Sequence, residues 1–112
     1  MKQAFSFGEL QRELSDSGKS YLEFLHSNSL SVGLYALPAG GTDTQQPHTE
    51  DEVYSVLSGR AVLRVGGTDY AVEPGSVIFV GAKVEHRFHT ITEDLAVLVF
   101  FAPAEYSLAA NE

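Results

Sequence analysis

Residues 40–59 read GGTDTQQPHTEDEVYSVLSG and carry the clearest structural signal of this chain. From Glu52 onward the run is rich in β-branched and aromatic residues, which favour a strand, and Pro47 disfavours a helix ahead of it. Side chains alternate between the two faces of a strand, so Glu52, Tyr54 and Val56 are expected on one face. A lone carboxylate buried on such an apolar face is destabilising, and the usual remedy is a partner or a metal.

Short apolar segments separated by turn residues continue on both sides of this stretch. We predict strands over residues 21–25, 30–37, 52–57, 61–65, 70–72, 77–80, 84–91 and 95–102. A short amphipathic helix is expected over 5–14, and the absence of any long helix between strands argues against a parallel βαβ sheet. Many short strands in about ninety residues are typical of an all-β sandwich or barrel. The pattern therefore predicts a single all-β domain over residues 1–112.

Composition excludes several function classes. The chain has 112 residues, 7 basic against 15 acidic, and a formal net charge of −8, so nucleic acid and anionic membrane surfaces are not expected partners. It contains no cysteine, which removes disulfides, thiolate metal sites and a cysteine nucleophile. The first residues contain no apolar signal-peptide core, and the longest apolar run, 95–102, is too short to span a membrane. The expected location is the cytoplasm.

Two histidines and a glutamate form a candidate metal site. His86 falls on an otherwise apolar face of the predicted strand 84–91. Together His48, Glu52 and His86 would supply two imidazoles and one carboxylate, the donor set of non-haem Fe(II) sites with open coordination positions. Gln46 lies two residues before His48 and could add an amide oxygen. A hydrogen-bonded core histidine is the simpler interpretation, and spacing alone leaves both open.

The spacing of these residues resembles the first motif of the cupin superfamily, G-x5-H-x-H-x3-E-x6-G. The fixed positions of that motif fall on Gly40, Gln46, His48, Glu52 and Gly59, with Gln46 in place of the first histidine. Four identities at fixed spacings make this motif fairly specific. The second cupin motif, G-x5-P-x-G-x2-H-x3-N, aligns with Gly75, Gly81, Lys83, His86 and Thr90. Only the first glycine and the histidine of that motif match. The short stretch between the motifs is typical of small single-domain bacterial cupins.

The resemblance implies a double-stranded β-helix, or jelly-roll barrel, with its core at about residues 30–102 after a short N-terminal helical segment. It also implies a divalent metal inside the barrel, held by His48, Glu52 and His86. Gln46 would either be the fourth ligand or hydrogen-bond a bound water, and a metal-free descendant is the alternative. Nitrogen and oxygen ligands suit Fe, Mn, Ni, Zn, Co or Cu. Because the imidazoles must be neutral to bind, metal affinity is expected to fall below about pH 6.

Cupins of this size include dioxygenases and isomerases, so the fold does not settle the reaction. We expect a metal-dependent oxidoreductase of dioxygenase type, or an isomerase, acting on a small oxygenated organic molecule. Glu52 would serve as a base and Tyr54 would orient the substrate, unless Tyr54 is a packed aromatic with a satisfied hydroxyl. The alternatives are a non-catalytic module that binds a small ligand or metal, and a structural cupin whose site has degenerated.

Other residues have two interpretations each. Four phenylalanines are candidates for an apolar pocket wall or for plain core packing, namely Phe79, Phe88, Phe100 and Phe101. Val53 and Leu57 point outward in the predicted strand and would form a homodimer face, unless N-terminal residues of the same chain cover them. The remaining charged groups around the motifs are expected at the surface, namely His26, Glu50, Asp51, Arg87 and His89.

Overall fold

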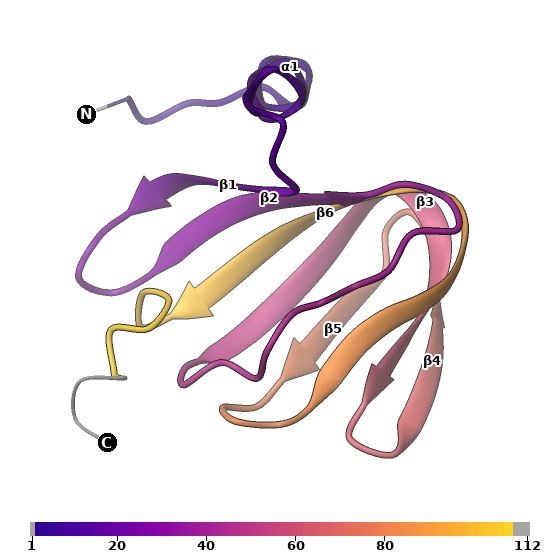
Figure 1. The fold of residues 1–112 in the computed structure, drawn as a ribbon. Helices are drawn as coiled ribbons and strands as arrows, with labels where there is room; N and C mark the ends of the chain where they lie inside the picture. The colour runs from indigo at the N-terminus through magenta and orange to yellow at the C-terminus, as the bar shows by residue number, and fades with distance from the viewer. Residues whose placement is uncertain (1, 109–112) are drawn as a thin grey trace.

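A computed structural model describes residues 2–108 of the chain as one helix followed by strands (Figure 1). The elements are α1 (Phe7–Ser17), β1 (Tyr21–His26), β2 (Ser31–Leu37), β3 (Asp51–Val65), β4 (Thr68–Val72), β5 (Val77–Val80) and β6 (His86–Ala102). The strands pair in the order β1-β2-β6-β3-β4, β5 pairs with β3, and every pairing is antiparallel. The all-β architecture predicted from the sequence is confirmed, and the curved sheet has the jelly-roll form without closing into a full cylinder.

Two pairs of predicted strands are in fact single long strands. Residues 52–57 and 61–65 both belong to β3, and most of 84–91 joins 95–102 in β6. The predicted turns between them are places where the ladder changes register, at three successive points between Val56 and Val62. Bulges of this kind insert residues into a strand and bend it without ending it. The turn-forming residues at 58–60 therefore mark a bend within β3 and not the end of a strand.

The ladder between β3 and β6 is bent so strongly that its two ends meet. It runs from the pair Asp51 and Ala102 to the pair Val65 and His86. A straight strand rises about 3.3 Å per residue, which would separate Glu52 from the His86 end by about 40 Å. In the folded chain Glu52 Oε1 lies 2.8 Å from His86 Nε2. The bend is thus what assembles the site.

Gly59 occupies the middle of this bend with a φ of 90°. A Cβ at this position would meet the carbonyl oxygen of Asp94 and lie 2.7 Å from the Cα of Leu95. Both neighbours are backbone atoms of β6, which cannot move aside by changing rotamer. Glycine is therefore required here both by the left-handed backbone and by the close approach of the two strands.

Two apolar cores lie on opposite faces of the sheet. The inner core fills the barrel and includes Tyr54, Phe88 and Phe101. On the outer face, α1 lies over the sheet (Figure 1). Its Leu10 and Leu14 pack against β2 and β6, and Leu57 packs at the edge of the same cluster. The N-terminal region of the chain therefore covers Leu57. Of the two interpretations of this residue, cover by the same chain holds and a dimer face does not.

Local signals explain where α1 begins and ends. Ser6 caps its N-terminus by accepting a hydrogen bond from the Glu9 amide, and Gly18 ends it with a φ of 71°. The helix therefore runs three residues beyond the predicted end at residue 14. Within residues 2–108 no helix is long and apolar enough to cross a membrane.

Candidate metal centre

The predicted triad comes together inside the barrel. His48 comes from the segment between β2 and β3, Glu52 from the start of β3, and His86 from the start of β6. Each offers a ligand atom, and these atoms lie within 4.8 Å of one another. Glu52 Oε1 is 2.8 Å from His86 Nε2 and 3.4 Å from His48 Nδ1. Neighbouring ligands of a metal with bonds of about 2.0–2.2 Å lie at comparable separations.

The backbone fixes which nitrogen His86 presents. Its Nδ1 lies 2.9 Å from the carbonyl oxygen of Val84, and a carbonyl can only accept, so Nδ1–H is the donor. In the neutral ring, Nε2 is then an unprotonated lone pair that faces Glu52. A backbone hydrogen bond of this type is the usual way in which a protein orients a metal-binding imidazole.

The polar atoms at the centre of the triad contact one another as ion pairs but form no hydrogen bond of good geometry. Within the described residues this holds for His48 Nδ1, both carboxylate oxygens of Glu52 and His86 Nε2, all of which are buried. Buried polar atoms in proteins are normally paired, so four unsatisfied atoms that converge require an explanation. A divalent cation would satisfy them together, and two imidazoles with a carboxylate suit a first-row transition metal better than Ca²⁺ or Mg²⁺. The residues present fit the metal that the sequence predicts.

Electrostatics without a metal place protons on the imidazoles. Burial alone would lower the pKa of His48, but hydrogen bonds and charge from Glu105 and Glu52 outweigh it and raise the pKa to about 9. Burial likewise opposes a raised pKa of His86, yet Glu52 raises it on balance. Burial would raise the pKa of Glu52, but the two histidines lower it. Metal binding would therefore displace a proton from His48, which moves the expected loss of affinity to a pH above 6.

Tyr54 and Gln46 lie differently with respect to the triad. Tyr54 is fully buried, and its hydroxyl accepts a hydrogen bond of 2.9 Å from Gln45 Nε2. Burial, reinforced by Glu52, raises its pKa well above the ordinary value, so the hydroxyl keeps its proton. Gln46 is exposed and lines a surface cavity of about 350 Å³ that also touches His86. Its role as a fourth ligand stays a prediction.

A buried aspartate that the sequence analysis did not single out holds the segment that carries His48 in place. Asp43 accepts hydrogen bonds from the Tyr35 hydroxyl at 2.7 Å and from the Phe88 amide at 2.9 Å. It also accepts from the amide and side chain of Gln45. This network ties the segment before β3 to β2 and β6. Its only sequence signal is an aspartate between the first motif's glycine and histidine positions.

Two glutamates join the C-terminal residues to the site. Glu105 Oε2 lies 2.9 Å from His48 Nε2, on the side of the ring away from Glu52. Glu50 was expected in solvent, but it is only 1% exposed and accepts hydrogen bonds from the amides of Tyr106 and Leu108. That expectation is wrong because backbone amides replace the water around the carboxylate. With neutral histidines, Glu52 and Glu105 together would balance the charge of a divalent cation.

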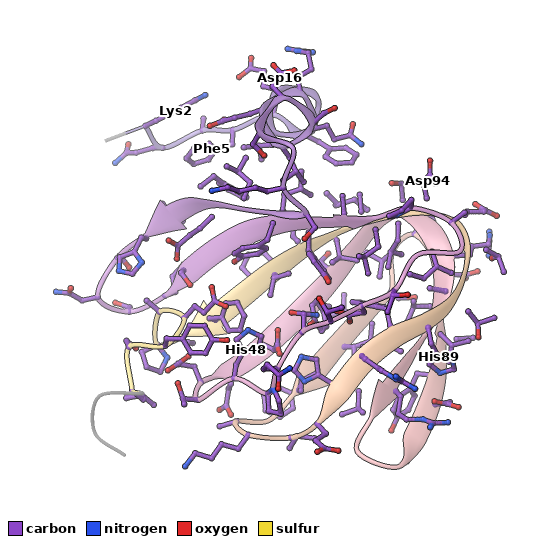
Figure 2. All side chains as sticks on the ribbon, in the orientation of Figure 1. Lys2, Phe5, Asp16, His48, His89 and Asp94 are labelled. Atoms are coloured by element: carbon purple, nitrogen blue, oxygen red, sulfur yellow. The ribbon has the colours of Figure 1, made fainter. Side chains whose placement is uncertain are left out.

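Two of the predicted pocket-wall phenylalanines face outward. Phe88 and Phe101 are buried in the barrel, whereas Phe79 is 61% and Phe100 38% exposed. The register explains this, because both exposed rings stand beside Val53 on the outer face of β3. The prediction of a wall is therefore wrong for Phe79 and Phe100. Figure 2 shows His48 within the barrel beside the C-terminal residues, while His89 lies apart from it and pairs with Asp69.

The departures from the second motif leave its backbone geometry intact. Lys83 and Thr90 stand where the motif has glycine and asparagine, and both have left-handed backbone, with φ of 64° and 49°. Glycine and asparagine are the residues that adopt this conformation most readily. The Lys83 amide also donates to the carbonyl of His48 at 2.6 Å, which links the two motif regions.

Comparisons with known proteins agree with this geometry. A family model described as the cupin domain matches residues 33–102, and the chain therefore belongs to the cupin family. An uncharacterised protein of Streptomyces coelicolor is 53% identical over 102 residues, covering 91% of this chain and 97% of that protein. Another, from Methanocaldococcus jannaschii, is 23% identical over 91 residues, covering 76% of this chain and 73% of its own.

Solved structures give the same result. A Thermus thermophilus protein of 30% identity superposes with a TM-score of 0.65, covering 75% of this chain and 82% of its own. A salicylate 1,2-dioxygenase from Pseudoaminobacter salicylatoxidans, solved with gentisate, superposes with a TM-score of 0.75 over 87% of this chain and 32% of its own. At 14% identity, the dioxygenase supports the fold alone.

Proposed function

We propose that this cupin binds one divalent transition metal at His48, Glu52 and His86 and works as a metal-dependent enzyme. The observation that carries the proposal is the convergence of three buried ligand groups whose facing atoms form no hydrogen bond of good geometry. Its substrate would be a small oxygenated organic molecule, and its chemistry dioxygenase-type oxidoreduction or isomerisation. When bound, the metal would supply Lewis acidity or a centre for dioxygen.

The roles of the protein groups follow from their protonation. Glu52 stays ionised beside the two imidazoles, so one of its oxygens could take a proton from a substrate. Tyr54 keeps its proton, and Gln45 fixes the position of its hydroxyl oxygen. A substrate oxygen would compete with Glu52 for the hydrogen bond that this hydroxyl donates. Phe88 packs against the Tyr54 ring at a centroid distance of 5.0 Å and holds it in place.

A non-catalytic metal-binding or ligand-binding module is the second candidate. The observation in its favour is the enclosure of the triad, because the side chains of His48, Glu52 and His86 are 5%, 1% and 1% exposed. An enzyme needs a coordination position that exchanges water or substrate. Proton relaxation of water in the Mn²⁺-loaded protein separates the two, since an exchanging bound water shortens the relaxation time and an enclosed ion does not.

The metal assignment is tested by elemental analysis. The protein, reconstituted with Fe²⁺, Mn²⁺, Ni²⁺ or Zn²⁺ and desalted, should retain about one equivalent. His86→Ala should lose it, because a ligand and the partner of Glu52 both disappear. His89→Ala is the matched control, since its ring pairs with Asp69 at the surface and should leave the metal in place. Equal metal content in the two variants, or none in the parent protein, would overturn the assignment.

Location in the cytoplasm and a homodimeric state remain proposals. Phe79, Val53 and Phe100 lie side by side on the outer face of β5, β3 and β6, where α1 does not reach. A second copy of the chain would cover this row in a symmetric dimer. Light scattering of the protein in solution gives the mass that decides between one chain and two.

A further inference from the structure

Residues 103–108, here called the C-terminal turn, lie beyond the last strand and beyond residue 102, where the match to the cupin-domain model ends. They nevertheless reach the metal centre. Glu105 Oε2 contacts His48 Nε2 at 2.9 Å, and the Tyr106 ring stacks on the His48 ring with centroids 5.2 Å apart and planes 30° apart. The C-terminal turn therefore forms one wall of the site.

Three hydrogen bonds fasten the C-terminal turn to the barrel. The Glu105 amide donates to Ser31 Oγ at 2.9 Å, and Ser31 is fully buried at the start of β2. The Tyr106 and Leu108 amides both donate to the carboxylate of Glu50, the Leu108 bond at 2.9 Å. Buried acceptors in β2 and in the segment just before β3 thus fix the backbone that carries Glu105. The fixed backbone in turn sets the direction from which the Glu105 side chain contacts His48.

We propose that Glu105 is a positioning residue for the metal ligand His48, and that metal binding and closure of the C-terminal turn are coupled. The proposal rests on the metal function proposed above. A neutral His48 ring that donates Nε2–H to Glu105 directs the lone pair of Nδ1 towards Glu52 and His86. A carboxylate behind a metal-bound imidazole fixes both its tautomer and its orientation.

Without the Glu105 carboxylate, no hydrogen bond to Nε2 fixes the orientation of the His48 ring. A half-turn about the Cβ–Cγ bond would carry Nδ1 away from Glu52, and either nitrogen could then hold the proton. The metal would have to select the correct orientation and tautomer at each binding event. Since coupling between two events is reciprocal, the affinity that closure of the C-terminal turn adds to the metal equals the stability that the metal adds to the closed turn.

The first measurement is the affinity of the protein for Co²⁺ and Zn²⁺, determined by competition with a chromophoric chelator. We expect Glu105→Ala to bind about 10–100-fold more weakly, the usual effect of removing such a supporting carboxylate. Glu105→Gln should stay within a few-fold of the parent protein, because the amide oxygen still accepts Nε2–H. Glu13→Ala is the matched control, an exposed glutamate on α1. Thermal unfolding followed by circular dichroism checks that each variant is folded.

The second measurement reports the coupling without any activity assay. Chymotrypsin cuts after tyrosine, so cleavage after Tyr106 measures opening of the C-terminal turn. Co²⁺ should slow this cleavage in the parent protein and in Glu105→Gln, and should have little effect in Glu105→Ala. If Glu105→Ala does not fold, the effect of Co²⁺ on cleavage of the parent protein still tests the coupling.

The outcomes separate the two proposals. A parent protein that binds neither ion would overturn the metal function itself. A parent protein that binds them while Glu105→Ala binds equally well would overturn the role of Glu105 alone. If Glu105→Gln is as weak as Glu105→Ala, the negative charge matters and ring orientation does not, which also refutes positioning. Cleavage after Tyr106 that ignores Co²⁺ in the parent protein would refute the coupling.

Discussion

Replacing Gly59 by alanine tests whether the bend between β3 and β6 assembles the metal site. Two unfavourable terms add at this position. A left-handed backbone at an alanine is unfavourable by about 1–2 kcal/mol. Crowding against the carbonyl of Asp94 and the Cα of Leu95, 2.7 Å from the new Cβ, adds about 1–3 kcal/mol. We therefore expect Gly59→Ala to lower the free energy of unfolding by about 2–5 kcal/mol.

Gly75 provides the matched control. Its φ of 94° is close to the 90° of Gly59, but a Cβ there would find no atom within 4 Å. Gly75→Ala should show only the backbone term of about 1–2 kcal/mol. Urea unfolding of both variants gives the comparison. Because the chain contains no tryptophan, circular dichroism is the signal to follow. Chelator competition with Zn²⁺ should show weaker binding for Gly59→Ala alone. Equal destabilisation, with unchanged Zn²⁺ affinity in both, would refute the reasoning.

Three further predictions concern the protonation of His48, the pH dependence of Zn²⁺ binding and the backbone strain at Thr90. Because the pKa of His48 is raised from 6.5 to about 9, its stabilisation of the metal-free protein is complete below pH 6.5 and is lost as pH rises through 9. Urea unfolding should show a loss of up to about 3 kcal/mol over this range, and the slope should shrink in His48→Gln. Zn²⁺ affinity should instead rise with pH up to about 9, and a flat profile would contradict the assignment. Thr90→Asn should add about 1 kcal/mol to stability by relieving left-handed backbone at a β-branched residue. Thr90 Oγ1 also lies 2.9 Å from His89 Nδ1, and a lower thermal midpoint of Thr90→Asn would show that loss of this hydrogen bond outweighs the relief of strain.

The residues of the triad could be predicted because their signals are local. Alternation placed Glu52 and Tyr54 on the inner face of β3, and both are buried there. The motif spacing selected His48 and His86 without any knowledge of the pairing. The strand pattern was right about where chain segments are extended. It could not show that residues 58–60 bend a strand, because a bulge and a turn use the same residue types.

Other features depended on contacts between distant parts of the chain. Glu105 follows the last strand without any surrounding pattern, and only the fold brings it to His48. Glu50 was assigned to solvent because nothing nearby could pair with it, but its partners lie 56 and 58 residues away. Phe79 was misassigned because its face depends on which residue of β3 it opposes. The alternation of side chains predicts which residues of one strand share a face. Which face of the sheet they occupy depends on the register with the neighbouring strand.

The meeting of Glu52 and His86 at the two ends of one bent ladder has a kinetic consequence. Those ends can approach only after β3 and β6 have paired and bent, so the triad belongs to the last contacts that form. Interactions absent from the folding transition state change the rate of unfolding and leave the rate of folding nearly unaltered. A cation bound across this closure would therefore lengthen the lifetime of the folded chain. Resistance to proteolysis and to heat would then follow metal supply even at unchanged folding speed.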